Sequence, residues 1–288
     1  MIPDKPLILP EITEYEEKIR VYRAAIFKEK PVIHHITNFV TIYQCARITA
    51  FLGAAPIMAF APEETTQITA KADALVVNTG TLNNTVMASI PKSLEYAGSH
   101  HIPVVLDPVG ASLSSYRSDF IRFLLNTFHF DVIRCNGAEL LNLHGQAALS
   151  RGIDGASSSV EIPKVARDLA QKYDCVMACT GARDYICSKD ESIVLDRGSE
   201  LLPTLVGTGC MVNSLIGAYL AVAKSPMAAA ACGILTMCLA SERAAQSLEK
   251  LTQGEKESKS PISPGQKRRC LGSFETALMD AVSEIYTS

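Results

Sequence analysis

The stretch "IPVVLDPVG" at residues 102–110 places an aspartate and a glycine-containing turn directly behind an apolar run. The consecutive apolar residues Val104, Val105 and Leu106 are typical of a strand that is buried on both faces, as in a parallel sheet. The next segment, 114–127, has helical periodicity. A buried strand followed by a helix is the repeating unit of an α/β fold.

This strand-then-helix pattern recurs along most of the chain. Short apolar runs rich in β-formers lie at 31–38, 55–60, 74–82, 102–110, 130–140 and 175–181. Helical periodicity is found at 11–29, 39–52, 63–71, 84–98, 114–127 and 160–173. The alternation predicts a central, mostly parallel sheet with helices on both faces. Residues 191–203 indicate strands and turns that extend the sheet in an antiparallel sense. Further helices are expected at 210–223, 225–249 and 272–286.

The composition is typical of a globular protein with a large core. Of 288 residues, 48% are hydrophobic and 20% are charged, and the formal net charge is −3. A slightly acidic chain is a poor match for nucleic acid or an anionic membrane. The nine cysteines are odd in number and form no CxxC pair, which favours free, buried thiols in a reducing compartment. We therefore expect a cytoplasmic protein with no nucleic-acid or membrane partner.

One polar segment interrupts the pattern near the end of the chain. Residues 252–270 contain Pro, Gly, Ser and many charges, so they cannot bury enough apolar surface to order themselves. The helix expected after this segment is too short to fold alone. We therefore expect one domain over residues 1–288, with a flexible insertion at about 252–270 that is dispensable for folding.

Small and polar residues gather where the predicted strands end. The endings read "HITN", "MAFAP", "NTGTL", "DPVG", "RCNGAEL", "CTGARD" and "VGTGC", in that order. Ligands of parallel α/β sheets bind outside the carboxyl ends of the strands. A role in the core explains the apolar halves of these segments but not the polar endings, so the endings indicate an active-site rim with exposed polar side chains.

Two carboxylates belong to this rim. Asp107 follows one buried strand, and Glu139 of "NGAEL" lies near a helix start after the next strand. Each is explained on its own by an ordinary role, Asp107 as a cap or turn former and Glu139 as a capping-box acid. Together they also fit a Mg²⁺ and phosphate site, because Mg²⁺ takes few carboxylates and keeps water and phosphate ligands.

The motif "VGTGC" at 206–210 offers a place for an anion. Gly207 and Gly209 allow a tight turn and a close backbone approach, and a helix that begins at Cys210 would present unpaired N–H groups. A plain glycine turn before a core helix remains the alternative. No GxxxxGK[ST] motif is present, so any nucleotide site needs another architecture. The helix N-terminus should lower the pKa of the Cys210 thiol.

The ordered motifs over residues 20–285 resemble the hydroxyethylthiazole kinase family, which belongs to the ribokinase-like superfamily. The resemblance is carried by "HHITNFV", "LGAAPIMAFAPEE", "ALVVNTGTL", "LDPVGA", "NGAELLNL", "CTGARDYI", "VGTGC" and "GSFETALMDAV". It implies a ribokinase-like fold and a cytosolic homotrimer with active sites at the subunit interfaces. It also implies ATP- and Mg²⁺-dependent phosphorylation of the primary alcohol of 4-methyl-5-(2-hydroxyethyl)thiazole, a thiamine precursor.

Carried over motif by motif, the resemblance implies a role for each of nine residues. These are Asn38, Met58 and Gly207 for the thiazole and its alcohol, Arg117, Thr180 and Gly209 for ATP, Asp107 and Glu139 for Mg²⁺ and its waters, and Cys210 for catalysis. Cys210 stands where other ribokinase-like enzymes have a catalytic aspartate. We interpret it as a proton acceptor or a positioning group for the alcohol, and not as a covalent nucleophile.

The chain also departs from the family pattern, and other functions compete. His35, Cys135, Ala182 and Leu205 replace the usual residues of their motifs, which bears on nucleotide preference and substrate specificity. The alternatives are a related kinase for another small alcohol, such as a hydroxymethylpyrimidine, an ATP-dependent dehydratase of the same fold, and a non-catalytic thiazole-binding protein. Cys210 argues against the first, because such a kinase is expected to have aspartate there.

Overall fold

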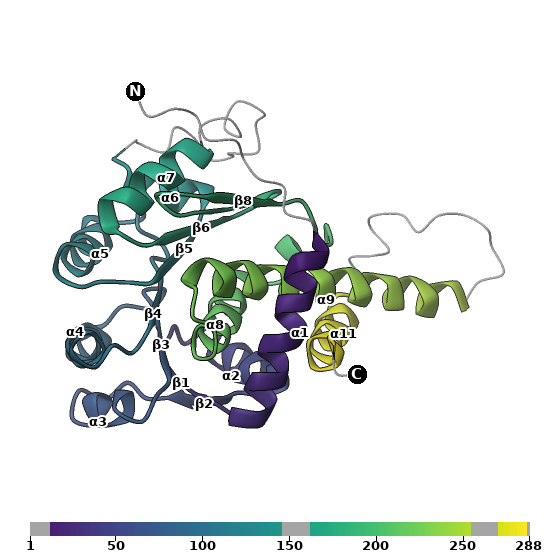
Figure 1. Ribbon diagram of the computed structural model, residues 1–288, viewed down its shortest axis with the longest axis horizontal. Helices are drawn as coiled ribbons and strands as arrows, with labels where there is room; N and C mark the ends of the chain where they lie inside the picture. Colours follow the sequence, from purple (N-terminus) through teal and green to yellow (C-terminus); the bar gives the residue numbers. More distant parts are fainter. Residues whose placement is uncertain (1–11, 146–161, 255–269, 287–288) are drawn as a thin grey trace.

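The computed structural model of the protein describes residues 12–145, 162–254 and 270–286, which form one sheet with helices packed on both of its faces (Figure 1). The sheet has eight strands in the order β2-β1-β3-β4-β5-β6-β7-β8. They are β1 (Val32–Ile36), β2 (Ala55–Met58), β3 (Ala74–Asn78), β4 (Val104–Asp107), β5 (Val132–Asn136), β6 (Val176–Thr180), β7 (Asp184–Cys187) and β8 (Ser192–Leu195). Strands β1 to β6 pair in parallel, and β7 and β8 continue the sheet antiparallel. The predicted fold class is confirmed.

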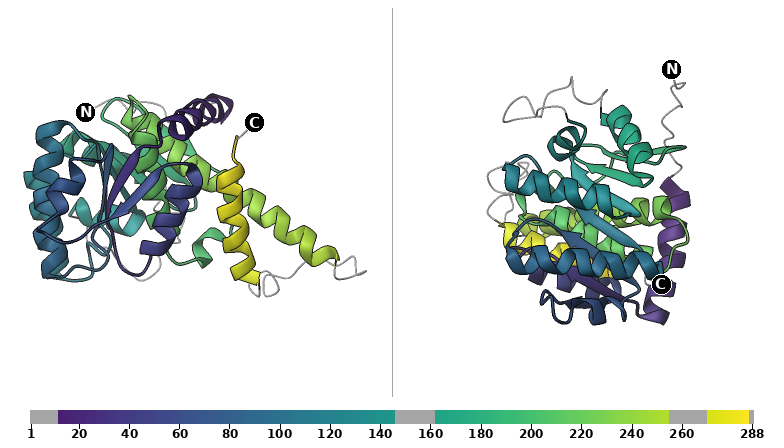
Figure 2. Two further views of the ribbon diagram at one scale, coloured as in Figure 1. Left: turned by 90° about the horizontal axis from the view of Figure 1, so that it is seen from below. Right: turned by 90° about the vertical axis from the view of Figure 1, so that its left-hand side faces the viewer.

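The helices divide between the two faces of the sheet. They are α1 (Ile12–Glu29), α2 (Ile42–Leu52), α3 (Thr65–Thr69), α4 (Asn84–His100), α5 (Ser115–Thr127), α6 (Gly137–Leu143), α7 (Ile162–Tyr173), α8 (Thr208–Leu220), α9 (Pro226–Gly254) and α11 (Leu271–Glu284), with a short 3-10 helix η1 (Leu202–Thr204). Helices α3, α4 and α5 lie on one face, and α1, α2, α8, α9 and α11 lie on the other (Figures 1 and 2).

Each face carries its own buried cluster, because side chains alternate along the strands. Leu75 and Val77 of β3 pack with α4 and α5, whereas Val76 between them packs with α8 and α9. Helix α8 lies close to the sheet, since a Cβ atom added at Gly217 would come within 2.5 Å of Val76. Helix α8 is therefore held against the middle of the sheet, and its first turn reaches the ends of the strands.

Three details differ from the sequence-based expectations. Strand β7 was not foreseen, and residues 191–203 contain only β8 and the 3-10 helix η1. Helix α8 begins at Thr208, two residues before the expected start at Cys210, because Gly207 adopts a left-handed conformation (φ +92°) and caps the helix. Residues 252–254 still belong to α9. The remainder of the expected insertion, up to residue 269, lies outside the described residues.

The cysteines and the long helix α9 agree with a globular core. Within the described part of the chain all nine cysteines are free, and seven of them are buried. One helix there, Pro226–Lys250, is long and apolar enough to cross a membrane by length and composition alone, yet 89% of its apolar window is buried in the protein. Burial of this kind is typical of a core helix.

Candidate active site

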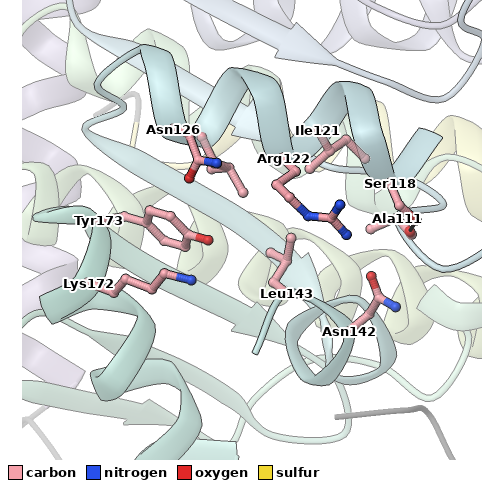
Figure 3. Close-up of a pocket in the computed structure, with 10 residues that line it drawn as sticks. Ala111, Ser118, Ile121, Arg122, Asn126, Asn142, Leu143, Lys172 and Tyr173 are labelled. Atoms are coloured by element: carbon pink, nitrogen blue, oxygen red, sulfur yellow. Dashed lines mark hydrogen bonds between the residues drawn. The ribbon is translucent and has the colours of Figure 1, made fainter. Parts of the chain in front are cut away.

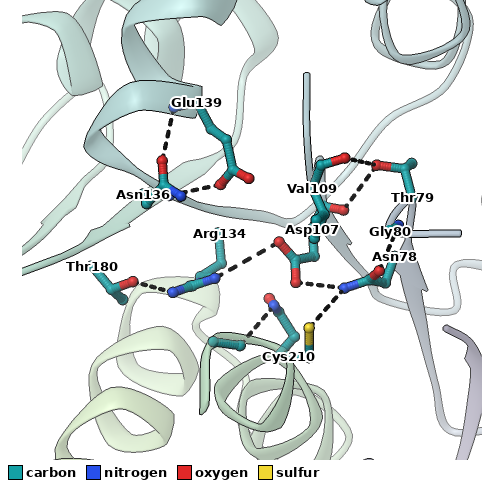
Figure 4. A network of polar contacts seen from close by, with 12 residues as sticks. Asn78, Thr79, Gly80, Asp107, Val109, Arg134, Asn136, Glu139, Thr180 and Cys210 are labelled. Atoms are coloured by element: carbon teal, nitrogen blue, oxygen red, sulfur yellow. Dashed lines mark hydrogen bonds and ion pairs between the residues drawn. The ribbon is translucent and has the colours of Figure 1, made fainter. Parts of the chain in front are cut away.

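The carboxyl ends of β3, β4 and β5 meet the first turn of α8, and polar side chains from all four elements meet there (Figure 4). Asn78 and Asp107 are the last residues of β3 and β4 and lie side by side in register. The Asn78 Nδ2 group donates to Asp107 Oδ2 at 2.6 Å and to Cys210 Sγ at 3.3 Å. The structure thus brings Asp107 and Cys210 together through one amide.

Asn38, two residues beyond β1, completes this contact with α8. Its Nδ2 group donates to Cys210 Sγ at 3.3 Å and to Asn78 Oδ1 at 3.1 Å. Its Oδ1 atom accepts the backbone N–H groups of Val40 and Thr41, each at 3.0 Å, and so shapes the turn into α2. The sulfur of Cys210 therefore lies between two amide donors, and the predicted residue Asn38 is part of the cluster.

The two predicted glycines are required by their surroundings. Gly207 has a positive φ, and a Cβ atom there would overlap the Thr41 side chain. A Cβ atom at Gly209 would overlap the guanidinium group of Arg134, with Nη2 at 2.7 Å and Cζ at 2.8 Å. Both glycines thus let neighbouring groups approach the backbone of the first turn of α8, where N–H groups lack partners within the helix.

Arg134 on β5 is a site residue that sequence reasoning missed. Its Nη2 group donates to Thr180 Oγ1, and its Nη1 group lies 3.8 Å from Asp107 Oδ1. Only 12% of its side chain is exposed. The signal was present, because Arg134 is a cation inside the buried strand sequence "DVIRCN". It joins the predicted residues Thr180, Gly209 and Asp107 into one group.

Asp107 is fully buried, so the expectation of an exposed carboxylate was wrong. Burial raises the pKa of Asp107 from 3.8 to about 7; the Arg134 guanidinium opposes this shift and the Glu139 carboxylate adds to it. Its Oδ2 atom accepts from Asn78, whereas Oδ1 has no hydrogen-bond partner among the described residues. Asp107 therefore keeps an acceptor atom whose nearest charged neighbour is the Arg134 guanidinium, 3.8 Å away.

Glu139 has the capping role that was considered as its ordinary explanation. Its Oε2 atom accepts the N–H group of Asn136 at 3.0 Å, and the Asn136 side chain accepts the N–H group of Glu139, which forms a capping box. Its Oε1 atom accepts the N–H group of Gly110 at 3.1 Å. Glu139 thus connects the start of α6 to the turn after β4, the strand that ends in Asp107.

The donor set around Asp107 and Glu139 fits a hard cation with few protein ligands. No group of three or more His, Cys, Asp and Glu side chains capable of holding a metal occurs in the described ranges. Two carboxylates, one with a free buried oxygen, match the way Mg²⁺ binds, through one or two carboxylates plus waters and phosphate oxygens. Zn²⁺ in a structural site would need four side-chain ligands.

The pKa expected for Cys210 was wrong. Burial, followed by the negative charge of Asp107, raises the pKa of the Cys210 thiol from 9.0 to about 12. These two effects outweigh the helix N-terminus, which favours the thiolate. Cys210 is therefore a neutral thiol at pH 7. Asn38 and Asn78 hold its sulfur in place.

Arg117 and Met58 lie at the margin of this cluster. The guanidinium of Arg117 donates to the backbone carbonyls of Thr79 at 2.5 Å and Gly80 at 2.8 Å, and so braces the loop after β3. Met58 is the last residue of β2, the edge strand, and pairs with His35 of β1. Neither side chain has a hydrogen bond to Asp107 or Cys210 among the described contacts.

A separate hollow of about 170 Å³ lies among α5, α6 and α7 (Figure 3). Its walls include Arg122 and Asn126 of α5, Asn142 of α6 and Tyr173 of α7. None of the nine predicted site residues lines it. The strand ends, and not this hollow, are therefore the candidate active site.

Comparison with known proteins identifies the family. The sequence model of the hydroxyethylthiazole kinase family matches residues 24–288. The chain belongs to the hydroxyethylthiazole kinase family. A hydroxyethylthiazole kinase from Alkaliphilus metalliredigens is 42% identical over 236 residues, which cover 82% of this chain and 86% of that protein. The chain is thus a kinase-family member along most of its length.

Solved structures agree with this family assignment. The hydroxyethylthiazole kinase protein from Pyrococcus horikoshii superimposes with a TM-score of 0.76 at 31% identity, over 93% of both chains. A ribokinase-like superfamily protein from Enterococcus faecalis has a TM-score of 0.52 at 14% identity, covering 86% of this chain and 87% of that one. The second likeness is one of fold alone: the chain shares the arrangement of strands and helices of that protein.

Proposed function

We propose that the protein transfers the γ-phosphoryl group of ATP to the primary alcohol of 4-methyl-5-(2-hydroxyethyl)thiazole, in thiamine biosynthesis or salvage. The observation that carries the proposal is the cluster at the start of α8, where Asp107, Arg134 and Cys210 lie together at the first turn of the helix. Membership of the hydroxyethylthiazole kinase family supports the choice of alcohol.

The phosphate groups of ATP bind on the Arg134 side of this cluster. A buried guanidinium, the Thr180 hydroxyl and the N–H groups at residues 208–210 are donors that suit the charge of a transferring phosphoryl group. Arg134 is favoured over Arg117 for this contact, because its buried Nε group has no hydrogen-bond partner among the described residues, whereas Arg117 donates to two backbone carbonyls. Arg117 then acts on ATP by bracing the loop after β3.

The alcohol binds on the Cys210 side, next to Asn38, Met58 and Gly207. Because the pKa of the Cys210 thiol is raised to about 12, Cys210 does not remove the proton as a thiolate. Its S–H group instead orients the alcohol oxygen, while Asn38 and Asn78 fix the sulfur. As the alcohol oxygen bonds to the γ-phosphorus and the bond to ADP breaks, the proton of the alcohol passes to an oxygen of the transferred phosphoryl group. Alignment and electrostatic stabilisation then supply most of the rate.

Asp107 and Glu139 would hold Mg²⁺ and its waters. When bound, Mg²⁺ neutralises the negative charge that develops on the phosphate oxygens. The Oδ1 atom of Asp107, which accepts no hydrogen bond among the described residues, supports this assignment. Arg134 offsets one of the two negative charges, that of Asp107, and a bound Mg²⁺ would offset the other.

We also propose a cytoplasmic homotrimer. Four large apolar side chains near the strand ends are exposed, and in a trimer the neighbouring subunit would cover them. They are Phe39 (53% exposed), Val40 (64%), Tyr43 (67%) and Val206 (74%). Sedimentation or light scattering of the purified protein gives the number of subunits directly.

An assay with a panel of alcohols tests the proposed reaction. ADP formation is measured with ATP, Mg²⁺ and, in turn, the hydroxyethylthiazole, a hydroxymethylpyrimidine and no acceptor. We expect turnover with the thiazole, loss of turnover in Asp107→Asn, and thiazole phosphate as the product by mass spectrometry. Faster turnover with the pyrimidine, or thiazole binding without ADP formation in the wild-type protein, would refute the proposal.

A further inference from the structure

Two histidines stand side by side in β1 and face opposite sides of the sheet. Both rings are fully buried. His34 lies within hydrogen-bond distance of the Thr69 hydroxyl of α3 and of the Ala59 carbonyl after β2. His35 faces α2 and α8, where its Nε2 atom is 3.1 Å from Ser214 Oγ. Of the two histidines, it is therefore His35 that connects β1 with α8, the helix whose first turn forms the candidate active site.

The contacts of His35 determine which nitrogen carries the hydrogen. The Ile33 carbonyl lies 3.1 Å from Nδ1 and can only accept, so Nδ1 donates and Nε2 accepts. Burial lowers the pKa of His35 to about 4, which keeps the ring neutral at pH 7. The Thr49 hydroxyl, 3.4 Å from Nε2, donates to the Cys45 carbonyl at 2.8 Å. Ser214 is therefore the donor to His35.

Ser214 has a competing acceptor on its own helix. Its Oγ atom lies 3.4 Å from the carbonyl of Cys210, one turn earlier, and a serine has a single hydrogen to donate. Serines that bond to the carbonyl four residues back tend to bend a helix. By accepting this hydrogen, His35 ties α8 to β1 directly below Cys210.

We propose that His35 is a positioning residue that acts through Ser214 to hold the first turn of α8 where its N–H groups and Cys210 meet the reacting groups. The inference rests on the proposed phosphoryl transfer at that turn. Close packing at Gly217 fixes the middle of α8, and the contact of Thr41 with Gly207 fixes its start. Between these two points, the hydrogen bond from Ser214 to His35 keeps the Ser214 hydroxyl from bonding to the Cys210 carbonyl and bending the helix there.

Substitutions on both sides of this hydrogen bond test the proposal. In His35→Leu and Ser214→Ala we expect kcat to fall by about 10–100-fold with little change in either KM, since displaced catalytic groups lower the rate of the chemical step. The double variant should be no slower than the slower single variant, because one interaction is lost. His35→Gln, which keeps an acceptor, should recover most of the rate. Thr49→Val is the matched control and should leave kcat unchanged.

Hydrogen exchange supplies a readout that does not depend on activity. We expect amide hydrogens near the start of α8 to exchange faster in Ser214→Ala and His35→Leu than in the wild-type protein and Thr49→Val. Losses of kcat that multiply in the double variant, or a lower Tm with unchanged kcat and exchange, would overturn the positioning role. If the wild-type protein phosphorylates no alcohol, the proposed function fails, and the exchange data still decide whether His35 ties α8 in place.

Discussion

Replacing Gly209 by alanine should separate activity from stability. The added Cβ atom would lie 2.7 Å from Nη2 and 2.8 Å from Cζ of Arg134, closer than real Cβ contacts allow. The flexible arginine must therefore move by about 1 Å, away from Thr180 and Asp107, and misplacement of that size costs about 100-fold in rate. This corresponds to about 2.7 kcal/mol of transition-state stabilisation. The N–H group of residue 209 is retained, so only the position of Arg134 changes.

The folded state should survive this substitution, because a gain in helix stability offsets part of the cost of moving Arg134. Exchange of glycine for alanine within a helix restricts the unfolded chain and stabilises by about 0.4–1 kcal/mol. Gly272 is the matched control, because it occupies the same second position of α11 and has no described atom within 4 Å of its added Cβ. We expect Gly272→Ala to keep or raise Tm, Gly209→Ala to stay folded with a Tm at or below that of the wild-type protein, and only Gly209→Ala to lose kcat.

Steady-state assays and thermal unfolding of three variants decide the matter. Gly209→Ala, Arg134→Ala and the double variant are compared with the wild-type protein and Gly272→Ala. If Gly209→Ala loses kcat because it displaces Arg134, the double variant is no slower than Arg134→Ala. Wild-type kcat in a folded Gly209→Ala protein would refute the reasoning, and so would independent, multiplying losses.

Four further outcomes are expected. In steady-state assays, Cys210→Ala should lower kcat by about 10–100-fold, as expected for loss of a positioning group, while Cys210→Asp should stay active. An inactive Cys210→Asp variant would contradict this role. Glu139→Gln, which keeps the capping box, should retain Tm but need more Mg²⁺ for half-maximal rate. His34→Leu should raise KM for the thiazole by about tenfold and leave KM for ATP unchanged. The reason is that the Ala59 carbonyl, next to Met58, loses its hydrogen bond. Folded Asp107 has its pKa raised from 3.8 to about 7, so it binds its proton more tightly than in the unfolded chain. Its contribution to stability therefore falls as pH rises from about 4 to about 7, and urea unfolding of Asp107→Asn should lack this trend.

The sheet could be predicted because each strand and each helix has a pattern that is visible within its own residues. Each parallel strand is buried on both faces and reads as a short apolar run, and the helices between the runs have their own periodicity. Strand β7 was missed because its four residues, beginning with Asp184, follow β6 after only a short turn. A hairpin so short has no periodicity of its own.

The chemistry of the site was less predictable because it depends on distant residues. The rule that a helix N-terminus lowers a thiol pKa holds locally, but Cys210 is also partly buried and lies near Asp107 of β4. Arg134 was missed for the same reason. Its neighbours in space, Thr180 and Gly209, are far away in the sequence, so the residues next to Arg134 do not indicate these contacts. The other site residues could be predicted from the polar residues at the strand ends, because these ends lie at one edge of a parallel sheet.

The contact between Asn38 and Cys210 has a consequence for biosynthesis. These residues are 172 positions apart, and α8 and α9 cover a sheet face whose strands β1 to β5 are made long before them. At about 5–20 residues per second, a growing chain exposes Val76 and Val105 for several seconds or longer before these helices emerge from the ribosome. Nascent chains that end before α8 should therefore bind chaperones at this sheet face and have no active site, and emergence of α8 and α9 should release them.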